Sequence, residues 1–423
     1  MLRSRHENKN KTAVVCKGGG FTEAKTKTSQ TAEYFVSRAD SVLAIPELWA
    51  TKFSYRVVRK NVEDGPCLIL MNHSAFIDLK IASRIFFPKP YTIVCTSDGF
   101  VGKNWLMRQI GCIPTQKFVT DLALLSDILY SLNTLKTSVL MYPEASYSFD
   151  GRATPLPRHL GKLIKKAGVP VVTVITEGAF LHNPLYNCLK QRKTKVSAVV
   201  NCLLTSAEVA EKSAEEIDAL LDQTFSFDNF ARQQQEKIAV TEPFRAEGLH
   251  RVLYACPACG AEGKTVGKGT RLTCAQCGKQ YELTEYGEMK ALQGKTEFPH
   301  IPDWYDWERE KVKKEVTDGT YRLDTAVKIG VLADYKAIYM VGEGRLVHDE
   351  NGFSLIGCDG ALQYTQPAGS FYGLYADYYW YEIGDVICIG NKERLYYCFV
   401  PDEVCVAKAR LAAEEQYRLK KGV

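Results

Sequence analysis

The 423-residue sequence lacks any long run of apolar residues. Its longest uncharged stretch, Gly360 to Ala376, is interrupted by Pro367, by two further glycines and by two glutamines. A membrane-spanning helix needs about 18–20 consecutive, mostly apolar residues. Apolar segments such as 67–71 and 169–175 have only the length of a strand. The sequence therefore predicts that any contact with a membrane is peripheral.

An apolar core typical of a secretory signal peptide, about 7–15 residues long, is also missing from residues 1–11. This favours a reducing, cytoplasmic location, in which clustered cysteines are metal ligands more often than disulfide partners. The chain contains 14 cysteines, so their spacing is informative. A length of 423 residues predicts two or three domains.

Four of the cysteines form two CxxC pairs with fourteen residues between the pairs, namely Cys256, Cys259, Cys274 and Cys277. Two such pairs, each followed by a glycine, are typical of a tetrahedral zinc site with four sulfur ligands. Because the protein would fill all four coordination positions, the zinc is expected to be structural. The sequence here is similar to a zinc ribbon. The other ten cysteines show no ligand spacing, and most of them are predicted to be small core residues in strands.

Neither sign of charge is in large excess, since the net charge of the whole chain is only +5. Residues 1–250 carry 32 Lys and Arg against 24 Asp and Glu, and the remainder carries 22 against 25. A mildly basic first half suits anionic lipids, phosphorylated substrates or nucleic acid, or a solvated surface without a partner. Because the zinc-ribbon segment has no dense Lys and Arg cluster, no nucleic-acid partner is expected.

Between about residues 54 and 205, strand-sized apolar runs alternate with helical stretches. This order predicts an α/β domain with a mixed, largely buried sheet flanked by helices. The expected strands are 67–71, 91–95, 138–142, 169–175 and 196–204, and the expected helices are 78–87, 122–135, 160–167, 206–221 and 227–240. Before this domain, residues 1–31 are predicted to be a mobile tail, and residues 32–53 an amphipathic helix.

The last third of the chain changes character again. A charged helix is expected at 308–316, followed from Tyr321 to Val400 by short aromatic and β-branched runs, clearest at 378–383, 385–390 and 394–400. A final helix is predicted to begin near Pro401, with acidic residues in its first turn and basic residues in its last. Seven or so strands followed by one helix resemble, in pattern only, a pleckstrin-homology or GRAM domain.

The sharpest chemical signal follows the strand at 67–71, where the sequence reads Asn72, His73, Ser74, Ala75, Phe76, Ile77 and Asp78. In a regular helix, residues five apart point about 140° away from each other. His73 and Asp78 therefore meet only if His73 lies in the turn before the helix and Asp78 on its first turns. A neutral imidazole oriented by a carboxylate is a general base suited to neutral pH. No G-x-S-x-G sequence occurs, so Ser74 is not predicted to be a nucleophile.

With three further motifs, this segment resembles the glycerolipid and lysophospholipid acyltransferase superfamily, in particular the 1-acylglycerol-3-phosphate acyltransferases. Residues 72–78 match the pattern NHxxxxD, 111–117 a Gly-led strand ending in a basic residue, 142–148 the pattern F/Y-P-E-G-x-x-S, and 169–172 an apolar V-P-V-V segment. The resemblance covers roughly residues 54–205.

The resemblance implies transfer of an acyl group from acyl-CoA or acyl carrier protein to a free hydroxyl of a lysophospholipid such as 1-acylglycerol 3-phosphate. His73 would remove the hydroxyl proton and Asp78 would orient the imidazole. The implied substrate-binding residues are Asn72, Lys117, Pro143, Glu144 and Arg152. The expected setting is the inner face of a membrane, with the protein bound peripherally to its surface.

The sequence departs from the family pattern at two places. Many members have Gly-Thr-Arg after the glutamate, where this chain has Ala145, Ser146 and Tyr147, and Lys117 stands where the family often has arginine. Lysine does not bind phosphate in the bidentate manner of arginine. Both changes weaken the expectation that the acceptor is lysophosphatidate and leave a bulkier or zwitterionic headgroup open.

The predicted organisation is a mobile tail at 1–31, an acyltransferase domain with its N-terminal amphipathic helix at 32–245, a zinc ribbon at 250–290, a linker helix at 291–318 and a β-rich domain with a C-terminal helix at 319–423. A rival interpretation is a zinc-ribbon binding or scaffold protein that carries an inactive acyltransferase-like domain. The two interpretations differ in whether His73 supports acyl transfer.

Overall fold

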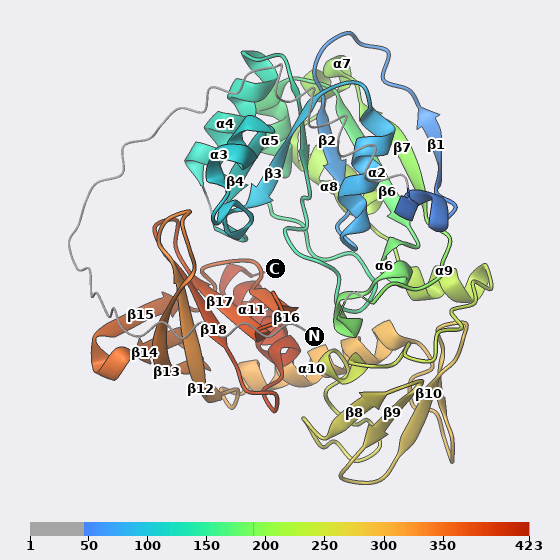
Figure 1. Ribbon diagram of the computed structural model, residues 1–423, viewed down its shortest axis with the longest axis vertical. Coiled ribbons are helices and arrows are strands. Elements are labelled where there is room, and N and C mark those ends of the chain that lie inside the picture. The colour runs from blue at the N-terminus through green and yellow to red at the C-terminus, as the bar shows by residue number, and fades with distance from the viewer. Residues whose placement is uncertain (1–45, 120, 189, 423) are drawn as a thin grey trace, which may run out of the picture.

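The structure is a computed structural model that describes residues 46–119, 121–188 and 190–422. The predicted tail and most of the predicted helix at 32–53 lie outside these residues; residues 46–50 are helical. Three sheets make up the described part: an α/β sheet, a small sheet and an antiparallel C-terminal sheet (Figure 1). No helix within the described ranges has the length and apolar character needed to cross a bilayer.

The first sheet has seven strands in the order β1-β7-β6-β2-β5-β3-β4. All neighbouring pairs are parallel except β6 and β7, so the sheet is mixed, as predicted. Its strands are β1 (Ser54–Arg59), β2 (Leu68–Met71), β3 (Tyr91–Thr96), β4 (Cys112–Thr115), β5 (Ser138–Met141), β6 (Val171–Glu177) and β7 (Ser197–Leu204). Their helices are α2 (Ile77–Phe86), α3 (Asn104–Gln109), α4 (Leu122–Asn133), α5 (Leu160–Ala167), α6 (Ala179–His182), α7 (Ser206–Glu211), α8 (Ala214–Thr224) and α9 (Asn229–Gln235).

Alternate residues of the central strand β2 supply two different cores. Ile69 and Met71 pack with helix α2 on one face, whereas Leu68 and Leu70 pack with α4, α5 and α8 on the other. All four side chains are essentially inaccessible to solvent. A strand buried on both faces needs a continuous apolar run, which explains why residues 67–71 show no polar alternation.

The helix predicted at 206–221 is two helices. A break at Lys212 and Ser213 separates α7 from α8, and each helix begins with a complete capping box, formed by Thr205 with Glu208 and by Ser213 with Glu216. The second box, Ser213 with Glu216, starts a new helix in the middle of the segment that apolar periodicity predicted as one helix. Its S-x-x-E pattern is visible in the sequence.

The second sheet has the order β11-β10-β9-β8 and carries the CxxC pairs. Its strands are β8 (Thr265–Lys268), β9 (Arg271–Cys274), β10 (Gln280–Leu283) and β11 (Met289–Ala291), and α10 (Ile301–Thr317) follows them. In Figure 1, α10 runs below the α/β part, from the small sheet towards the C-terminal sheet. The charged helix predicted at 308–316 is therefore confirmed but is longer than expected.

The C-terminal sheet has seven antiparallel strands in the order β15-β14-β13-β12-β18-β17-β16, so β12 pairs with β18, and one helix follows. The elements are β12 (Leu323–Leu332), β13 (Tyr339–Asp349), β14 (Gly352–Gly357), β15 (Leu362–Pro367), β16 (Tyr375–Trp380), β17 (Gly384–Gly390), β18 (Leu395–Phe399) and α11 (Val406–Lys421). This confirms the terminal helix and the strands predicted at 385–390 and 394–400, whereas the strand predicted at 378–383 lies at 375–380 and residues 381–383 form a turn. The helix begins later than predicted, so Asp402 and Glu403 precede it and its first turn has no acidic residue.

The three sheets share one buried core. It includes Phe149 and Phe180 from the α/β part, Tyr281 of β10, Trp304 of α10 and Leu411 of α11. This core brings together segments that lie more than 250 residues apart in the sequence, such as those of Phe149 and Leu411. Each segment covers apolar side chains of the others.

Candidate active site

All the predicted catalytic segments lie at one edge of the α/β sheet. His73 follows β2, Lys117 follows β4 and Glu144 follows β5, and these strands are parallel neighbours or next neighbours in the sheet. Because parallel strands end at the same edge, their carboxyl ends bring these side chains together. The C-terminal sheet lies against this edge (Figure 1), as the contacts of Tyr375 below show.

His73 and Asp78 meet in the way that the sequence predicts. His73 lies in the turn before α2 and Asp78 in its first turn, with 3.3 Å between Nδ1 and Oδ2. The same Oδ2 accepts the backbone N–H groups of Ser74 (2.7 Å) and Ala75 (2.9 Å). The Asp78 side chain is completely buried. A carboxylate held by two backbone donors fixes the imidazole with a proton on Nδ1, leaving Nε2 as the basic nitrogen.

The His73 imidazole lies between two tyrosine rings. Its ring centroid is 4.1 Å from that of Tyr142 and 4.1 Å from that of Tyr147. Burial lowers the pKa of His73 below 6.5, opposed by the hydrogen bond to Asp78, while the Lys117 charge lowers it further. The imidazole is therefore neutral near pH 7, and Nε2 has no hydrogen-bond partner in the described part of the chain.

Asn72 ties the histidine turn to the neighbouring strand. It is fully buried, its Nδ2 donates to the Thr176 carbonyl (3.2 Å), and its Oδ1 accepts the Thr176 N–H (2.7 Å). The Thr176 hydroxyl also lies 3.4 Å from Asp78 Oδ1. These bonds hold the ends of β2 and β6 together beneath His73. The structure therefore gives Asn72 a supporting position, with no exposed atom for a substrate.

Glu144 supports the same turn from the other side. Its Oε2 accepts the His73 N–H and its Oε1 accepts the Thr154 N–H, each at 2.8 Å. The carboxyl is fully buried, and burial raises its pKa to about 7 against the effect of these two donors. Pro143, before it, is also buried. Glu144 therefore holds the backbone of the histidine turn to the backbone at Thr154.

Lys117 points from the end of β4 towards the C-terminal sheet. Its Nζ lies 4.1 Å from the ring centroid of Tyr375 on β16 and 6.0 Å from that of Tyr147. The Tyr375 hydroxyl donates to Asp98 Oδ2 at 2.7 Å. Within the described residues the Lys117 ammonium forms no ion pair. It is therefore an unpaired cation near Tyr147, whose ring lies against His73.

Arg152 is not brought to the His73 group. Its guanidinium binds both oxygens of Asp306 on α10, at 2.7 and 2.6 Å, and also Asp150 at 2.7 Å. Bidentate carboxylate pairing uses the donors that a phosphate would need. These contacts link the α/β part to α10 and give no support to the prediction that Arg152 binds substrate.

Residues that the sequence analysis left without a role complete the site. Tyr142 and Tyr147 enclose the imidazole, Thr176 supports Asn72 and Asp78, and Asp98 and Tyr375 join the site to the C-terminal sheet. Tyr147 was visible only as a departure from a family pattern. No local pattern indicates a role for Tyr375, because it lies 258 positions after Lys117 in the sequence.

The four CxxC cysteines meet at the end of the small sheet. Their Sγ atoms all lie within 4.8 Å of one another, with 3.7 Å between Cys256 and Cys277 and 3.8 Å between Cys259 and Cys274. Tetrahedral zinc–sulfur bonds of about 2.3 Å place sulfur atoms about 3.8 Å apart. Gly260 and Gly278 have φ values of 77° and 74°, which permits the tight turn after each pair. The cluster therefore fits a structural zinc ion.

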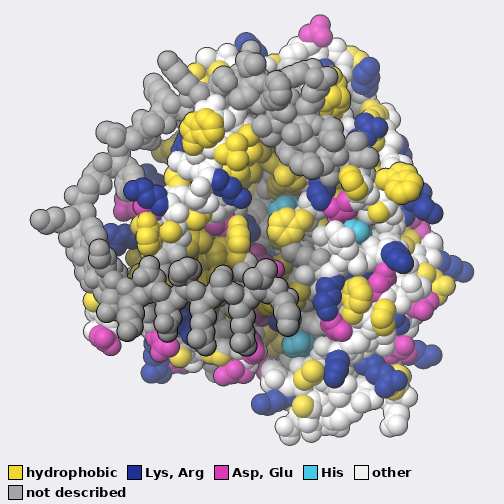
Figure 2. All heavy atoms as spheres, in the orientation of Figure 1, with side chains coloured by type: hydrophobic (Ala, Val, Ile, Leu, Met, Phe, Trp, Pro, Cys, Tyr) yellow, Lys and Arg dark blue, Asp and Glu magenta, His cyan; other side chains and the backbone are white. Residues whose placement is uncertain are grey.

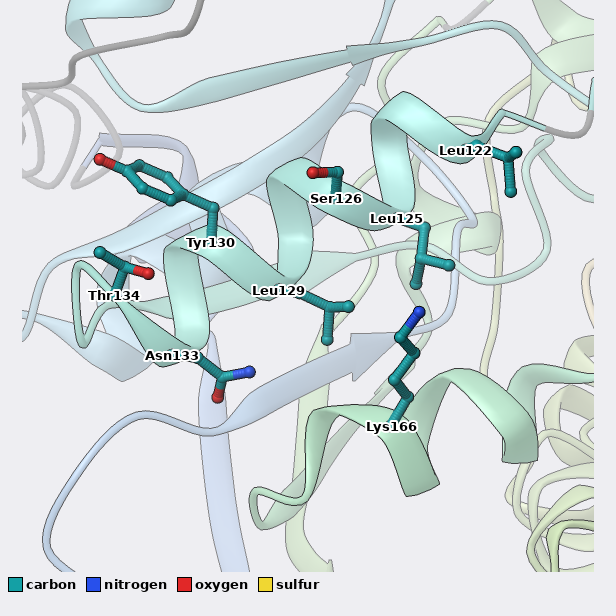
Figure 3. Close-up of a pocket in the computed structure, with 8 residues that line it drawn as sticks. All are labelled: Leu122, Leu125, Ser126, Leu129, Tyr130, Asn133, Thr134 and Lys166. Carbon is teal, nitrogen blue, oxygen red and sulfur yellow. The ribbon is translucent and has the colours of Figure 1, made fainter.

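A groove of about 510 Å³ lies elsewhere, between α4 and α5. Figure 3 shows Leu125, Leu129 and Lys166 pointing into a common space. None of its lining residues belongs to the four motifs; they are Leu122, Leu125, Ser126, Leu129, Tyr130, Asn133, Thr134 and Lys166. The groove is therefore separate from the His73 site.

Comparison with known proteins identifies the part of the chain that holds the site. A family model described as Acyltransferase matches residues 54–177. Residues 54–177 are an acyltransferase domain. The match contains all four motifs, so the acyltransferase domain includes His73, Lys117 and Glu144.

Curated relatives of the acyltransferase domain are similar at low identity. A 1-acyl-sn-glycerol-3-phosphate acyltransferase BAT2, chloroplastic, from Brassica napus is 25% identical over 146 residues, 32% of this chain and 42% of that protein. The human 1-acyl-sn-glycerol-3-phosphate acyltransferase beta is 23% identical over 177 residues, 41% of this chain and 62% of that protein. This chain therefore spans less than two thirds of each relative. The crystal structure of the 1-acyl-sn-glycerophosphate (LPA) acyltransferase PlsC from Thermotoga maritima has a TM-score of 0.36 and 16% identity, covering 48% of this chain and 81% of PlsC.

Proposed function

We propose that this protein transfers an acyl group from acyl-CoA or acyl carrier protein to a free hydroxyl of a lysophospholipid. The observation that carries the proposal is the His73–Asp78 pair, in which Nδ1 contacts the carboxylate and Nε2 has no hydrogen-bond partner among the described residues. The named activity of the curated relatives supports 1-acylglycerol 3-phosphate as the first acceptor to assay. No covalent intermediate on the protein is required.

In the proposed reaction, His73 Nε2 removes the proton from the acceptor hydroxyl as its oxygen attacks the thioester carbonyl carbon. The carbon–sulfur bond then breaks, and the imidazolium returns the proton to the leaving thiolate. The negative charge of Asp78 stabilises the imidazolium, and two backbone N–H donors hold the carboxylate in position beside it. The tyrosine rings on both faces of His73 favour the cation by cation–π attraction.

The test is a direct assay of acyl transfer with purified full-length protein, lysophospholipids and both donor types. His73→Gln should reduce transfer to the background rate, because the amide is not basic, while the melting temperature stays near that of the wild type. His159→Gln is the matched control, since this histidine directly precedes α5 and lies outside the four motifs. Full activity of His73→Gln would contradict the proposed base.

We further propose peripheral binding to a membrane surface, since the acceptor is a lipid. Large side chains are exposed near the site: Phe76, 61% exposed, packs on Tyr147, and Trp105 on α3 is 74% exposed. Figure 2 shows hydrophobic side chains gathered over the α3 region. Flotation of the full chain with liposomes should be weakened by Trp105→Ser; equal flotation of the two proteins would contradict a role for this residue.

A further inference from the structure

The side chains of β16 extend the active site beyond the acyltransferase domain. Tyr375 and Asp377 are two residues apart on this strand, so their side chains lie on the same face of the sheet. The Lys117 ammonium lies over the Tyr375 ring. Tyr375 also packs in an apolar cluster with Phe118 and Val101 of the acyltransferase domain. The intervening Ala376 faces the other core. Asp377 therefore points towards the active-site side.

Asp377 is a buried carboxylate with unused bonding capacity. Its Oδ1 accepts the N–H of Tyr378 at 2.9 Å, and no other partner is found among the described residues. Burial raises its pKa to about 6, opposed by the Lys117 charge, so the group is mainly ionised at neutral pH. Lys117 and Asp377 influence each other without forming an ion pair, which leaves both charges available to a ligand.

Aromatic rings lie beside both charges. The ring centroid of Tyr147 lies 6.0 Å from the Lys117 Nζ. The Tyr375 ring, two residues before Asp377 on the same face of β16, lies 4.1 Å from the same Nζ. Burial raises the pKa of Tyr147 and of Tyr381, and the negative charge of Asp377 adds to both shifts. A carboxylate with tyrosine rings around it is a favourable environment for an organic ammonium.

The same region is a poor environment for a phosphate monoester. Lys117 is its one unpaired cation within the described residues, Asp98 and Asp377 add two carboxylates, and Arg152 is already bound by Asp306. A dianion would be repelled by the carboxylates and held by a single lysine. A phosphodiester that carries its own ammonium group matches one cation and one free carboxylate.

We propose that Lys117 and Asp377 form a two-point site for the headgroup of a zwitterionic lysophospholipid, with Lys117 binding the phosphodiester and Asp377 the headgroup ammonium. This inference rests on the proposed acyl transfer and specifies the acceptor. It also makes the C-terminal sheet part of substrate recognition, because Asp377 belongs to β16.

The test compares three acceptors with the same acyl chain: lysophosphatidylethanolamine, lysophosphatidylglycerol and lysophosphatidate. The wild type should have its highest kcat/KM with lysophosphatidylethanolamine. Asp377→Asn keeps the oxygen that accepts the Tyr378 N–H and removes the charge, so it should lower this value about tenfold or more while sparing lysophosphatidylglycerol. Lys117→Met should weaken both phosphodiester acceptors alike. The control Asp359→Asn, on an exposed turn of the same sheet, should change neither.

Two outcomes would overturn the inference: a wild-type preference for lysophosphatidate, or equal effects of Asp377→Asn on the ethanolamine and glycerol acceptors. The second result would mean that Asp377 only balances the charge of Lys117. Calorimetric binding of the water-soluble headgroup glycerophosphoethanolamine separates this inference from the proposed catalysis. His73→Gln should bind it as the wild type does, whereas Asp377→Asn should lose binding. Absence of binding to the wild type would overturn the headgroup site even if acyl transfer were observed.

Discussion

At the scale of single residues, the site depends on hydrogen bonds that hold one imidazole. Asp78 Oδ2 receives three donors, from His73, Ser74 and Ala75, and Glu144 holds the backbone N–H of His73 from the opposite side. Each of these acceptors is buried, so no water competes for its bonds. The orientation of the His73 imidazole therefore depends on Asp78, and the position of its backbone depends on Glu144.

Asp78→Asn tests the role of the carboxylate. The amide keeps one oxygen for the backbone donors but cannot stabilise the imidazolium, and it permits the wrong tautomer of His73. We expect kcat to fall by about 10²–10⁴-fold with little change in KM for the acceptor, measured by steady-state acyl transfer. The control Asp127→Asn on α4 should retain wild-type kcat. A kcat within twofold of the wild type for Asp78→Asn would contradict the assigned role.

A buried histidine in the C-terminal sheet predicts a dependence of stability on pH. His348 accepts the Tyr321 hydroxyl at Nδ1 and donates to Gln416 Oε1 from Nε2, each at 3.0 Å, and burial lowers its pKa to about 4. Below its unfolded pKa of about 6.5, the unfolded chain binds a proton that the folded chain does not. Stability is therefore lost as the pH falls from about 6.5 to 4.

The expected loss is on the order of 3 kcal/mol, because the two pKa values differ by about 2.5. Chemical denaturation between pH 4 and 7.5 measures it. His348→Gln cannot titrate and should show a smaller loss over this range than the wild type. The same pH dependence in both proteins would contradict the prediction.

At the scale of elements, packing overrides local preference. Gly161 lies within α5, where alanine would favour the helix by about 0.5–1 kcal/mol. A Cβ at this position would lie 2.0 Å from the Ala214 carbonyl oxygen at the start of α8. The contact is with backbone, which cannot rotate away, so the close approach of α5 and α8 requires glycine.

Gly161→Ala should therefore destabilise the protein by about 1–3 kcal/mol in urea denaturation, despite its higher helix propensity. Gly99→Ala is the control, since no heavy atom lies within 4 Å of the Cβ it would add and its φ is not positive. A Gly161→Ala protein more stable than the wild type would show that the two helices separate easily.

At the scale of the whole molecule, the CxxC cluster is joined to both larger sheets. The shared core includes Leu272 and Tyr281 of the small sheet, Trp304 of α10 and Phe149 of the acyltransferase domain. Loss of a bound metal would therefore affect more than the small sheet.

We expect about one zinc per chain in purified protein by mass spectrometry. Cys259→Ser should remove most of the metal and lower the melting temperature, and unfolding should stay a single transition because the core is shared. Cys202→Ser, a buried cysteine outside the cluster, is the control and should retain the metal. Full zinc content in Cys259→Ser would contradict this ligand assignment.

Much of the fold and part of the site follow from local sequence. The run at 67–71 predicts β2 within one residue, the cysteine spacing predicts the four-sulfur cluster, and residues 72–78 predict the geometry of His73 and Asp78. These features depend on residues close together in the chain, whose periodicity or spacing reflects the structure they form. The helix start at Val406 was missed because the residues before it, Pro401 to Val404, form a turn that docks on the core.

Local patterns are sufficient to predict a mixed α/β domain, a four-cysteine cluster and a strand-rich C-terminal part. Tertiary packing alone places the Tyr375 ring beside Lys117 and the Tyr147 ring against His73, and pairs Arg152 with Asp306. The physical reason is that these contacts join distant segments. They depend on how whole elements pack against the carboxyl edge of the sheet, which no local pattern encodes.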